Sequence, residues 1–259
     1  MPLNNKYTFK IASLRTPKIT SKTLSGALRY EVVQELCGNK NIGIELGVAK
    51  GNFSKHMVES KKFKLFFGVD SYSDFHDVSE YKEAIQNIGL EKPYKLLRMP
   101  FDEALDLFED DYFDFIYIDG FAHTGEEGGK TLCDWYKKLK IGGVISGDDY
   151  HADWPLVIWA VNHFTAQTGG ILKLTEKTET IGYSLYPSWY IKKENIKLPK
   201  PDPELVIIAN KERQRIHRKR FGVLRNVERL LSRLLKKHGW RHPIKRLTGK
   251  FIKYKPPLK

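Results

Sequence analysis

The chain has 259 residues, enough to bury one large core and leave segments outside it. Its net charge is +13, but residues 211–259 alone hold 18 Lys and Arg against 2 Asp and Glu, so the remaining body is slightly acidic. Two cysteines at unrelated positions exclude a disulfide framework, and no apolar run reaches the roughly 20 residues of a membrane span.

Strand and helix patterns alternate along the body. We predict, in chain order, a helix over 25–36, strands over 42–46 and 65–69, a helix over 81–88, a strand over 95–98, a helix over 102–108, a strand over 113–118, a helix over 130–139, a strand over 144–146, a helix over 155–166, and strands over 171–174 and 180–185 as an antiparallel pair. This order predicts an α/β fold with a Rossmann-like doubly wound sheet, mostly parallel with an antiparallel last strand. We divide the chain into an N-terminal extension (1–24), this domain (25–210) and a basic C-terminal helical extension (211–259).

A loop with two glycines follows the first predicted strand. Gly47 and Gly51 stand before a helical segment that starts near Phe53, and such a turn brings bare backbone N–H groups close to a ligand. Their spacing, G-x-x-x-G, differs from the G-x-G-x-x-G of dinucleotide-binding loops. Glu45, two residues before Gly47, favours a ligand with a cationic group, such as the amine and sulfonium of S-adenosylmethionine. Turns of this kind also occur without a cofactor, so the loop alone leaves both interpretations open.

Acidic residues also lie at the ends of later strands. Asp70 comes about twenty residues past the loop, where an acidic side chain accepts the ribose hydroxyls of a nucleotide or caps the next helix. Asp119 follows the strand over 113–118, and Asp148 and Asp149 follow the strand over 144–146. Ligands of parallel α/β sheets bind at the carboxyl ends of the strands, so this coincidence predicts an active site there.

Four motifs carry a resemblance to a known family: Ile44-Glu45-Leu46-Gly47, Gly68-Val69-Asp70, Phe113 to Gly120 with His123, and Gly142 to Tyr150. Over residues 25–187 the chain resembles the class I S-adenosylmethionine-dependent methyltransferases. More narrowly, it is similar to small bacterial metal-dependent O-methyltransferases that act on sugar hydroxyls, relatives of the macrolide-sugar and cephalosporin-type enzymes and of the catechol methyltransferases.

The resemblance implies a role for individual residues. The cofactor S-adenosylmethionine is expected at Glu45, Gly47, Gly51, Ser54, Asp70 and Ser71, and Mg²⁺ or another divalent cation at Asp119, Asp148 and Asp149. His123 is expected to act as the base beside Asp119. It follows Asp119 by four residues rather than the three that are common in the family, and His151 is the less favoured substitute.

The chemistry of methyl transfer to an alcohol agrees with such a site. A hydroxyl keeps its proton at neutral pH, so a Lewis-acidic metal or a general base assists its attack, and Mg²⁺ prefers oxygen ligands such as carboxylates. The same residues also have plainer interpretations: Asp148-Asp149 as a turn and helix cap, and His123 as a surface histidine. Tyr150 and Trp154 either form a sugar-binding face or pack against the sheet.

The basic extension has apolar residues at helical spacing from Ile216 to Leu235, with arginines and lysines opposite them. A basic amphipathic helix fits an anionic membrane surface, RNA, or packing against its own domain or a second copy in a homo-oligomer. The first residues of the chain lack the apolar core of a secretory signal. We therefore expect a cytoplasmic protein, peripheral at the inner membrane surface if the extension binds lipid.

These features together predict an S-adenosylmethionine-dependent O-methyltransferase that acts on a sugar, a glycan or another small polyhydroxylated molecule, assisted by a divalent metal. One alternative is an RNA methyltransferase recruited by the basic extension. Another is a scaffold that retains the fold and the cofactor site without catalysis.

Overall fold

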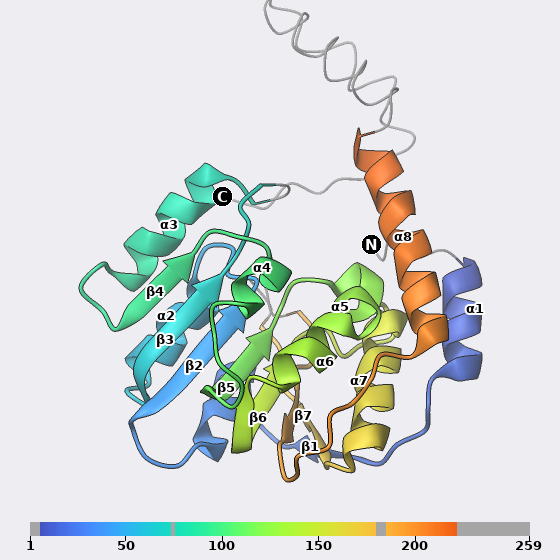
Figure 1. The fold of residues 1–259 in the computed structure, drawn as a ribbon, viewed down its shortest axis with the longest axis horizontal. Coiled ribbons are helices and arrows are strands. Elements are labelled where there is room, and N and C mark those ends of the chain that lie inside the picture. The colour runs from blue at the N-terminus through green and yellow to red at the C-terminus, as the bar shows by residue number, and fades with distance from the viewer. Residues whose placement is uncertain (1–5, 74–75, 180–184, 222–259) are drawn as a thin grey trace, which may run out of the picture. The chain divides into compact units, whose positions relative to one another are not determined.

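The computed structural model describes residues 6–73, 76–179 and 185–221. The chain divides into two units, Met1–Glu212 and Arg213–Lys259, and the site described below belongs to the first. Within the described residues, eight strands form one sheet in the order β1-β7-β8-β6-β5-β2-β3-β4 (Figure 1). The strands are β1 (Ser21–Leu24), β2 (Asn41–Leu46), β3 (Phe63–Val69), β4 (Tyr94–Leu97), β5 (Phe113–Ile118), β6 (Leu139–Gly147), β7 (Leu172–Thr175) and β8 (Trp189–Lys192).

Helices cover both faces of this sheet. They are α1 (Lys6–Arg15), η1 (Arg29–Glu35), α2 (Asn52–Glu59), α3 (Val78–Ile88), α4 (Phe101–Leu105), η2 (Ala122–Thr124), α5 (Gly125–Gly128), α6 (Lys130–Tyr136), α7 (Pro155–Thr168) and α8 (Pro203–Phe221). Buried side chains of α4, α6 and α7 pack on one face with Ile116 and Ile118 of β5. Those of η1, α2 and α3 pack on the other face with Phe115 and Tyr117. Because successive residues of a strand point to opposite faces, a strand covered on both sides is apolar along most of its length, as β5 is from Phe115 to Ile118.

The predicted fold is confirmed. The sheet is mostly parallel, and β8 pairs antiparallel with both β6 and β7. The antiparallel partner of β7 is Trp189–Lys192, however, and not the predicted strand over 180–185, of which 180–184 lie outside the described residues.

The strand predicted over 144–146 begins earlier in the structure, because β6 runs from Leu139 to Gly147. Phe113 pairs with Leu139 and Phe115 with Val144, so the register shifts between these pairs. Gly142 has a φ of +83°, a conformation that glycine adopts without steric cost. The two glycines therefore form an irregularity inside the strand.

The helix expected over 25–36 is a shorter 3₁₀ helix, η1, although its apolar face is buried as the pattern predicts. Val32, Val33 and Leu36 all join the core against α2. Residues of the predicted N-terminal extension (1–24) are part of the folded domain. β1 pairs in parallel with β7, and Ala12 of α1 packs against Trp159 of α7.

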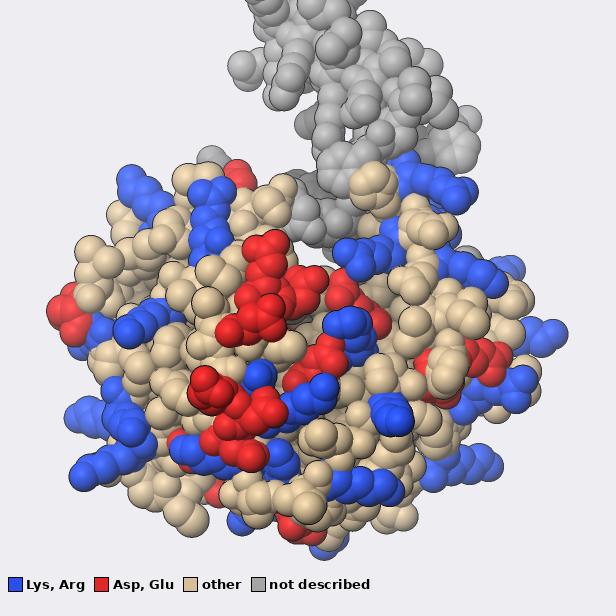
Figure 2. Space-filling model, in the orientation of Figure 1, with Lys and Arg blue, Asp and Glu red and all other residues tan. Residues whose placement is uncertain are grey.

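The surface and the chain's last part bear on the predicted partners. In Figure 2 acidic side chains gather in the middle of the face shown, and most lysines and arginines lie toward its edges. The helix that leads into the basic extension, α8, begins at Pro203, well before residue 211. Residues 222–259, which hold most of the predicted amphipathic pattern, lie outside the described residues. Among the helices that are described, none is long and apolar enough to cross a membrane.

Candidate active site

The loop between β2 and α2 takes a course that requires glycine at both predicted positions. Gly47 has a φ of +98°, and a Cβ atom there would lie 1.8 Å from the carbonyl oxygen of Asp119. Gly51, the residue before α2, has a φ of +79°, and a Cβ would lie 2.9 Å from Ile88. Gly47 thus lets the loop lie directly against the carboxyl end of β5, next to the first predicted metal ligand.

Asp70 holds this loop from the end of β3. Its Oδ2 accepts hydrogen bonds from the backbone N–H groups of Val48 and Ala49, each at 3.0 Å, and its Oδ1 accepts one from Tyr72 N–H at 3.0 Å. Ala49 has a φ of +47°, which is unfavourable for a residue with a Cβ, and the bond to Asp70 stabilises it there. Asp70 therefore shapes the loop, in addition to the ribose contact predicted for it.

Glu45 and Ser54 form a buried pair behind the loop. Ser54 Oγ donates a hydrogen bond to Glu45 and lies 3.0 Å from the hydroxyl of Tyr94. Glu45 is only 1% exposed, and burial raises its pKa well above the usual range. Ser71, the other predicted cofactor residue, follows Asp70 directly and is partly buried.

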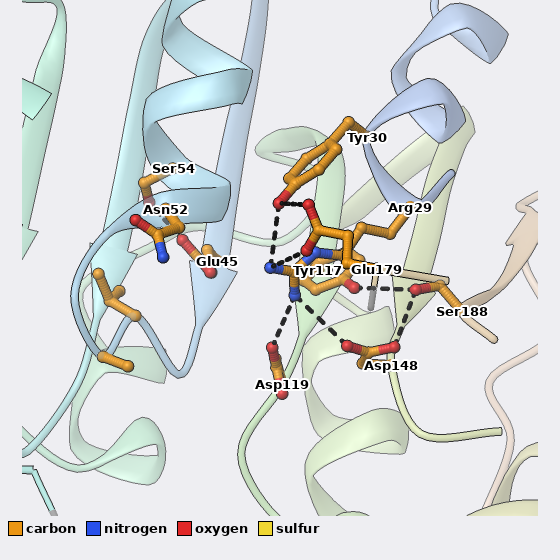
Figure 3. A network of polar contacts seen from close by, with 12 residues as sticks. Arg29, Tyr30, Glu45, Asn52, Ser54, Tyr117, Asp119, Asp148, Glu179 and Ser188 are labelled. Carbon is orange, nitrogen blue, oxygen red and sulfur yellow. Dashed lines mark hydrogen bonds and ion pairs between the residues drawn. The ribbon is translucent and has the colours of Figure 1, made fainter. Parts of the chain in front are cut away.

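At the ends of β5 and β6, the structure brings Asp119 and Asp148 together around a cation. Arg29 Nη1 lies 3.5 Å from Asp119 Oδ2 and 3.4 Å from Asp148 Oδ2 (Figure 3). Its Nη2 lies 3.3 Å from the hydroxyl of Tyr30 and 3.8 Å from Glu179 Oε2. The Arg29 side chain is 2% exposed, so this is a buried ionic network.

Asp148 has a second anchor on the far side from Arg29. Ser188 Oγ donates to Asp148 Oδ1 at 3.0 Å and lies 3.1 Å from the Tyr117 hydroxyl. Asp149 is partly buried, and its φ of +62° turns the chain sharply after the pair. Asp119 and Asp148 therefore lie together at the strand ends, with Asp149 next to Asp148 in the chain.

The carboxyl groups outnumber the positive charge beside them. Burial, together with the neighbouring carboxylates, raises the pKa of Asp148 to about 7 and that of Asp149 to about 8, and burial raises the pKa of Asp119. Burial acts to lower the pKa of Arg29, but the surrounding oxygens of Tyr117, Asp119 and Asp148 raise it overall, so the guanidinium stays charged. The site as a whole favours a ligand with positive charge.

Residues 44–150, which contain the loop and all three strand ends, match the family model of a methyltransferase domain. This match supports an S-adenosylmethionine-dependent methyltransferase. Among solved structures, cofactor-bound Rv0187 from MTB is similar with a TM-score of 0.50 at 14% identity, over 74% of this chain and 92% of that one. A proposed O-methyltransferase from Klebsiella pneumoniae has a TM-score of 0.48 at 16% identity, over 73% and 87%. No curated protein matches the sequence.

The first of these structures supports the Rossmann-like fold of the chain. The family match covers the loop from Gly47 to Gly51, Asp70 and the ends of β5 and β6, where the sequence predicts the ligand edge.

The structure does not support the expected Mg²⁺ ligand set. In the described ranges no group of three or more His, Cys, Asp or Glu residues is placed to hold a metal ion. The reason is visible at Asp119 and Asp148, whose Oδ2 atoms both face Arg29 Nη1. One oxygen of each of these two expected metal ligands is thus already paired with the guanidinium of Arg29.

His123 lies in η2, partly buried, and not on an exposed loop. Its ring meets that of Trp154 edge to face, with the centroids 4.7 Å apart. Trp154 therefore packs, as its plainer interpretation held, but it packs against the predicted base. The substitute, His151, stacks on Tyr186 at 4.6 Å.

Sequence reasoning missed Glu126, which lies in a left-handed turn between η2 and α6. The φ angles from Gly125 to Gly129 are all positive, including +53° for Glu126 and +51° for Glu127. Glu126 is 2% exposed, and its Oε2 has no hydrogen-bond partner among the described residues. Burial, then Asp119 and Asp149, raises its pKa well above the usual range. The Gly-Glu-Glu-Gly-Gly run is the signal for this turn, because glycine tolerates positive φ.

Arg29 was missed as well, although the sequence carries a signal for it. Arg29, Val32, Val33 and Leu36 follow the i, i+3, i+4, i+7 spacing of one helical face, and the last three are buried. A charged residue on an apolar face is buried only when it is paired. The pattern thus predicts an anionic partner, but it does not say which one.

Proposed function

We propose that this methyltransferase transfers the methyl group to a hydroxyl of a sugar, a glycan or another small polyhydroxylated molecule. The contact between the glycine loop and the end of β5 carries the proposal, since the Cβ position of Gly47 lies 1.8 Å from the Asp119 carbonyl oxygen. A methyl donor held by the loop is therefore adjacent to the carboxyl groups that can bind hydroxyls. Donor and acceptor meet at one strand edge, as in-line transfer requires.

The cofactor half of the site suits S-adenosylmethionine. The loop from Gly47 to Gly51 offers backbone N–H groups, and Asp70 lies at its side with oxygen lone pairs left for ribose hydroxyls. The excess of buried carboxyl groups around Asp119 complements the positive charge of the sulfonium and the amine.

The acceptor half suits a molecule rich in hydroxyls. Asp119 has a side chain that is 28% exposed, whereas Asp148 is 2% exposed, so Asp119 is the member of the pair that a hydroxyl can reach. His123 and Trp154 lie on the η2 side of the same strand ends and offer ring surfaces and a base. In the transfer, the acceptor oxygen forms a bond to the methyl carbon and the carbon–sulfur bond breaks. S-adenosylhomocysteine leaves, and the hydroxyl proton passes to His123, which we assign as the general base.

The experiment is an assay of methyl transfer from labelled S-adenosylmethionine to a panel of sugars, glycans and nucleic acids. We expect label in the hydroxylated small molecules, with a linkage stable to mild base as an ether is. Label in RNA would favour the alternative of an RNA methyltransferase. Cofactor binding without any transfer would favour the non-catalytic scaffold, and calorimetry with S-adenosylhomocysteine separates that case from an inactive preparation.

A further inference from the structure

We propose that Arg29 takes the place of the divalent cation in this site, and that methyl transfer proceeds without a metal. In this assignment Arg29 is a positioning residue that neutralises and orients Asp119 and Asp148. The assignment rests on the proposed function, because it concerns the acceptor side of that reaction.

The first step of the argument is the direction of the guanidinium. Nη1 faces one oxygen of Asp119 and one of Asp148, at 3.5 and 3.4 Å, and Nη2 faces Tyr30 and Glu179 (Figure 3). Arg29 thus bridges the two strand ends from which the metal ligands were expected. A metal bridging the two Oδ2 atoms would have to displace Arg29 Nη1, and the other oxygen of Asp148 already accepts a hydrogen bond from Ser188.

The second step is burial. Arg29 and Asp148 side chains are each 2% exposed, so the pair is shielded from solvent and screening by salt is weak. A buried cation is tolerated only when anions and hydrogen-bond acceptors surround it, and Arg29 has three carboxylates within 4.0 Å. A divalent ion entering between Asp119 and Asp148 would be repelled by this fixed charge.

The third step is that packing holds Arg29 in place. Its guanidinium carbon lies 5.0 Å from the ring centroid of Tyr30 and 5.6 Å from that of Phe53. Tyr30 in turn stacks on His56 of α2, with centroids 3.8 Å apart. The neighbouring Val32 is buried in the core. Because η1 is anchored on α2 in this way, the guanidinium is a built part of the site and not a mobile surface group.

The consequence concerns Asp119. It is the partly exposed member of the pair, and its carbonyl oxygen abuts the cofactor loop at Gly47. Arg29 holds one carboxylate oxygen of Asp119 and leaves the other available to an acceptor hydroxyl. Asp119, oriented by Arg29, thus aligns the acceptor hydroxyl, which is the role that the sequence predicts for a metal ion.

The test is a titration of the full chain with Mn²⁺, followed by electron paramagnetic resonance, which needs no substrate. We expect the unmodified protein to leave the free Mn²⁺ signal unchanged, and Arg29→Ala to gain Mn²⁺ binding because it frees both carboxylates. Adding Asp148→Asn to Arg29→Ala should remove that gain. Lys193→Ala is the matched control: it deletes another buried cation, paired with Asp111, and should bind no Mn²⁺.

Binding of Mn²⁺ by the unmodified protein that Asp148→Asn abolishes would overturn the proposal, as would loss of methyl transfer on chelation. If Arg29→Ala does not fold, as judged by binding of S-adenosylhomocysteine, the Asp148→Asn comparison in the unmodified background decides instead. A protein that methylates no hydroxyl under any condition refutes the proposed function, while the Mn²⁺ result still settles the role of Arg29.

Discussion

The two halves of the site are built by different means. On the cofactor side, Gly47, Gly51 and Asp70 shape a loop by backbone geometry within 24 residues of sequence. On the acceptor side, Arg29 lies 90 residues from Asp119 and 119 residues from Asp148 in the chain. The first half is local and depends on φ angles and backbone hydrogen bonds, and the second depends on charges that only the folded chain brings together. Substitutions in the first half should therefore disturb the backbone of the loop, and substitutions in the second half should disturb the balance of charge.

The largest effect is expected for Gly47→Ala. The new Cβ would lie 1.8 Å from the Asp119 carbonyl oxygen in a backbone with a φ of +98°, so the loop and the end of β5 must separate. We expect a loss of roughly 3 kcal/mol or more in the free energy of unfolding and no measurable cofactor binding. Denaturant unfolding and calorimetry with S-adenosylhomocysteine measure the two quantities.

Gly38→Ala is the matched control for this prediction. Gly38 has a φ of +68°, but nothing lies within 4 Å of the Cβ position, so only the backbone strain of about 1 kcal/mol applies. Equal losses in the two variants would show that the close approach to Asp119 does not matter for the cofactor half.

Asp70→Ala should have the next largest effect, and mainly on binding. It removes the acceptor for the N–H groups of Val48 and Ala49 as well as the predicted ribose contact. We expect cofactor affinity to fall by roughly 1.5–3 kcal/mol. Asp77→Ala is the control, since Asp77 caps α3 through Ser79 and Glu80 and its loss should cost about 1 kcal/mol of stability. A folded Asp70→Ala protein with unchanged affinity would refute the assignment.

On the acceptor side, Glu126→Gln should change how stability depends on pH. Burial raises the pKa of Glu126 in the folded state, so the folded protein keeps a proton that the unfolded chain releases. Stability therefore falls as pH rises from the unfolded value toward the folded one, by about 1.4 kcal/mol per unit of pKa elevation. Glutamine is neutral, so the variant should gain stability over the parent at alkaline pH and little at acidic pH.

Denaturant unfolding over a range of pH measures this difference, with Glu127→Gln as control. Glu127 shares the left-handed turn, with a φ of +51°, but is less buried than Glu126. If the free energy of unfolding of both variants changed by the same amount at every pH, the effect would come from the turn and not from the buried carboxyl group.

The smallest effect on the site is expected from deleting residues 222–259, which hold twelve Lys and Arg and one Glu. The site lies in the other unit, so cofactor affinity should stay the same. If the segment binds an anionic membrane surface, the full chain should bind phosphatidylserine vesicles, more weakly as salt rises, and the shortened chain should not. A preference for neutral lipid or for RNA would contradict binding to an anionic membrane surface. A dimer that is lost when the segment is deleted would indicate that the segment is an interface between copies of the chain.

The cofactor half could be predicted from sequence because its signals are local. Buried strands leave continuous apolar runs, and a G-x-x-x-G turn with acidic residues at neighbouring strand ends needs no distant partner to be recognised. The strand ends at Asp70, Asp119 and Asp148 lie where these patterns place them. At Gly47 the structure adds a second reason for glycine, because a Cβ atom there would clash with the carbonyl oxygen of Asp119.

The acceptor half could be predicted only in its carboxylates. Asp119 and Asp148 follow their strands by local rules, but what balances their charge depends on which segment folds over them. Either a metal ion or a guanidinium satisfies the same oxygens, and the choice falls to Arg29 because η1 packs on α2. The strained turn at Glu126 is likewise held by tertiary contact, since Gly125 lies against the backbone of Leu156.

The sequence by itself determined the alternation of strands and helices and the acidic residues at the carboxyl ends of the strands, because apolar periodicity and turn chemistry depend on a few neighbouring residues. Only the tertiary structure decided the position of β8, the pairing of β1 with β7, and the cation between Asp119 and Asp148. These depend on contacts between residues far apart in the chain, whose free energy arises only when the core closes, so the local pattern does not specify which residues will be partners.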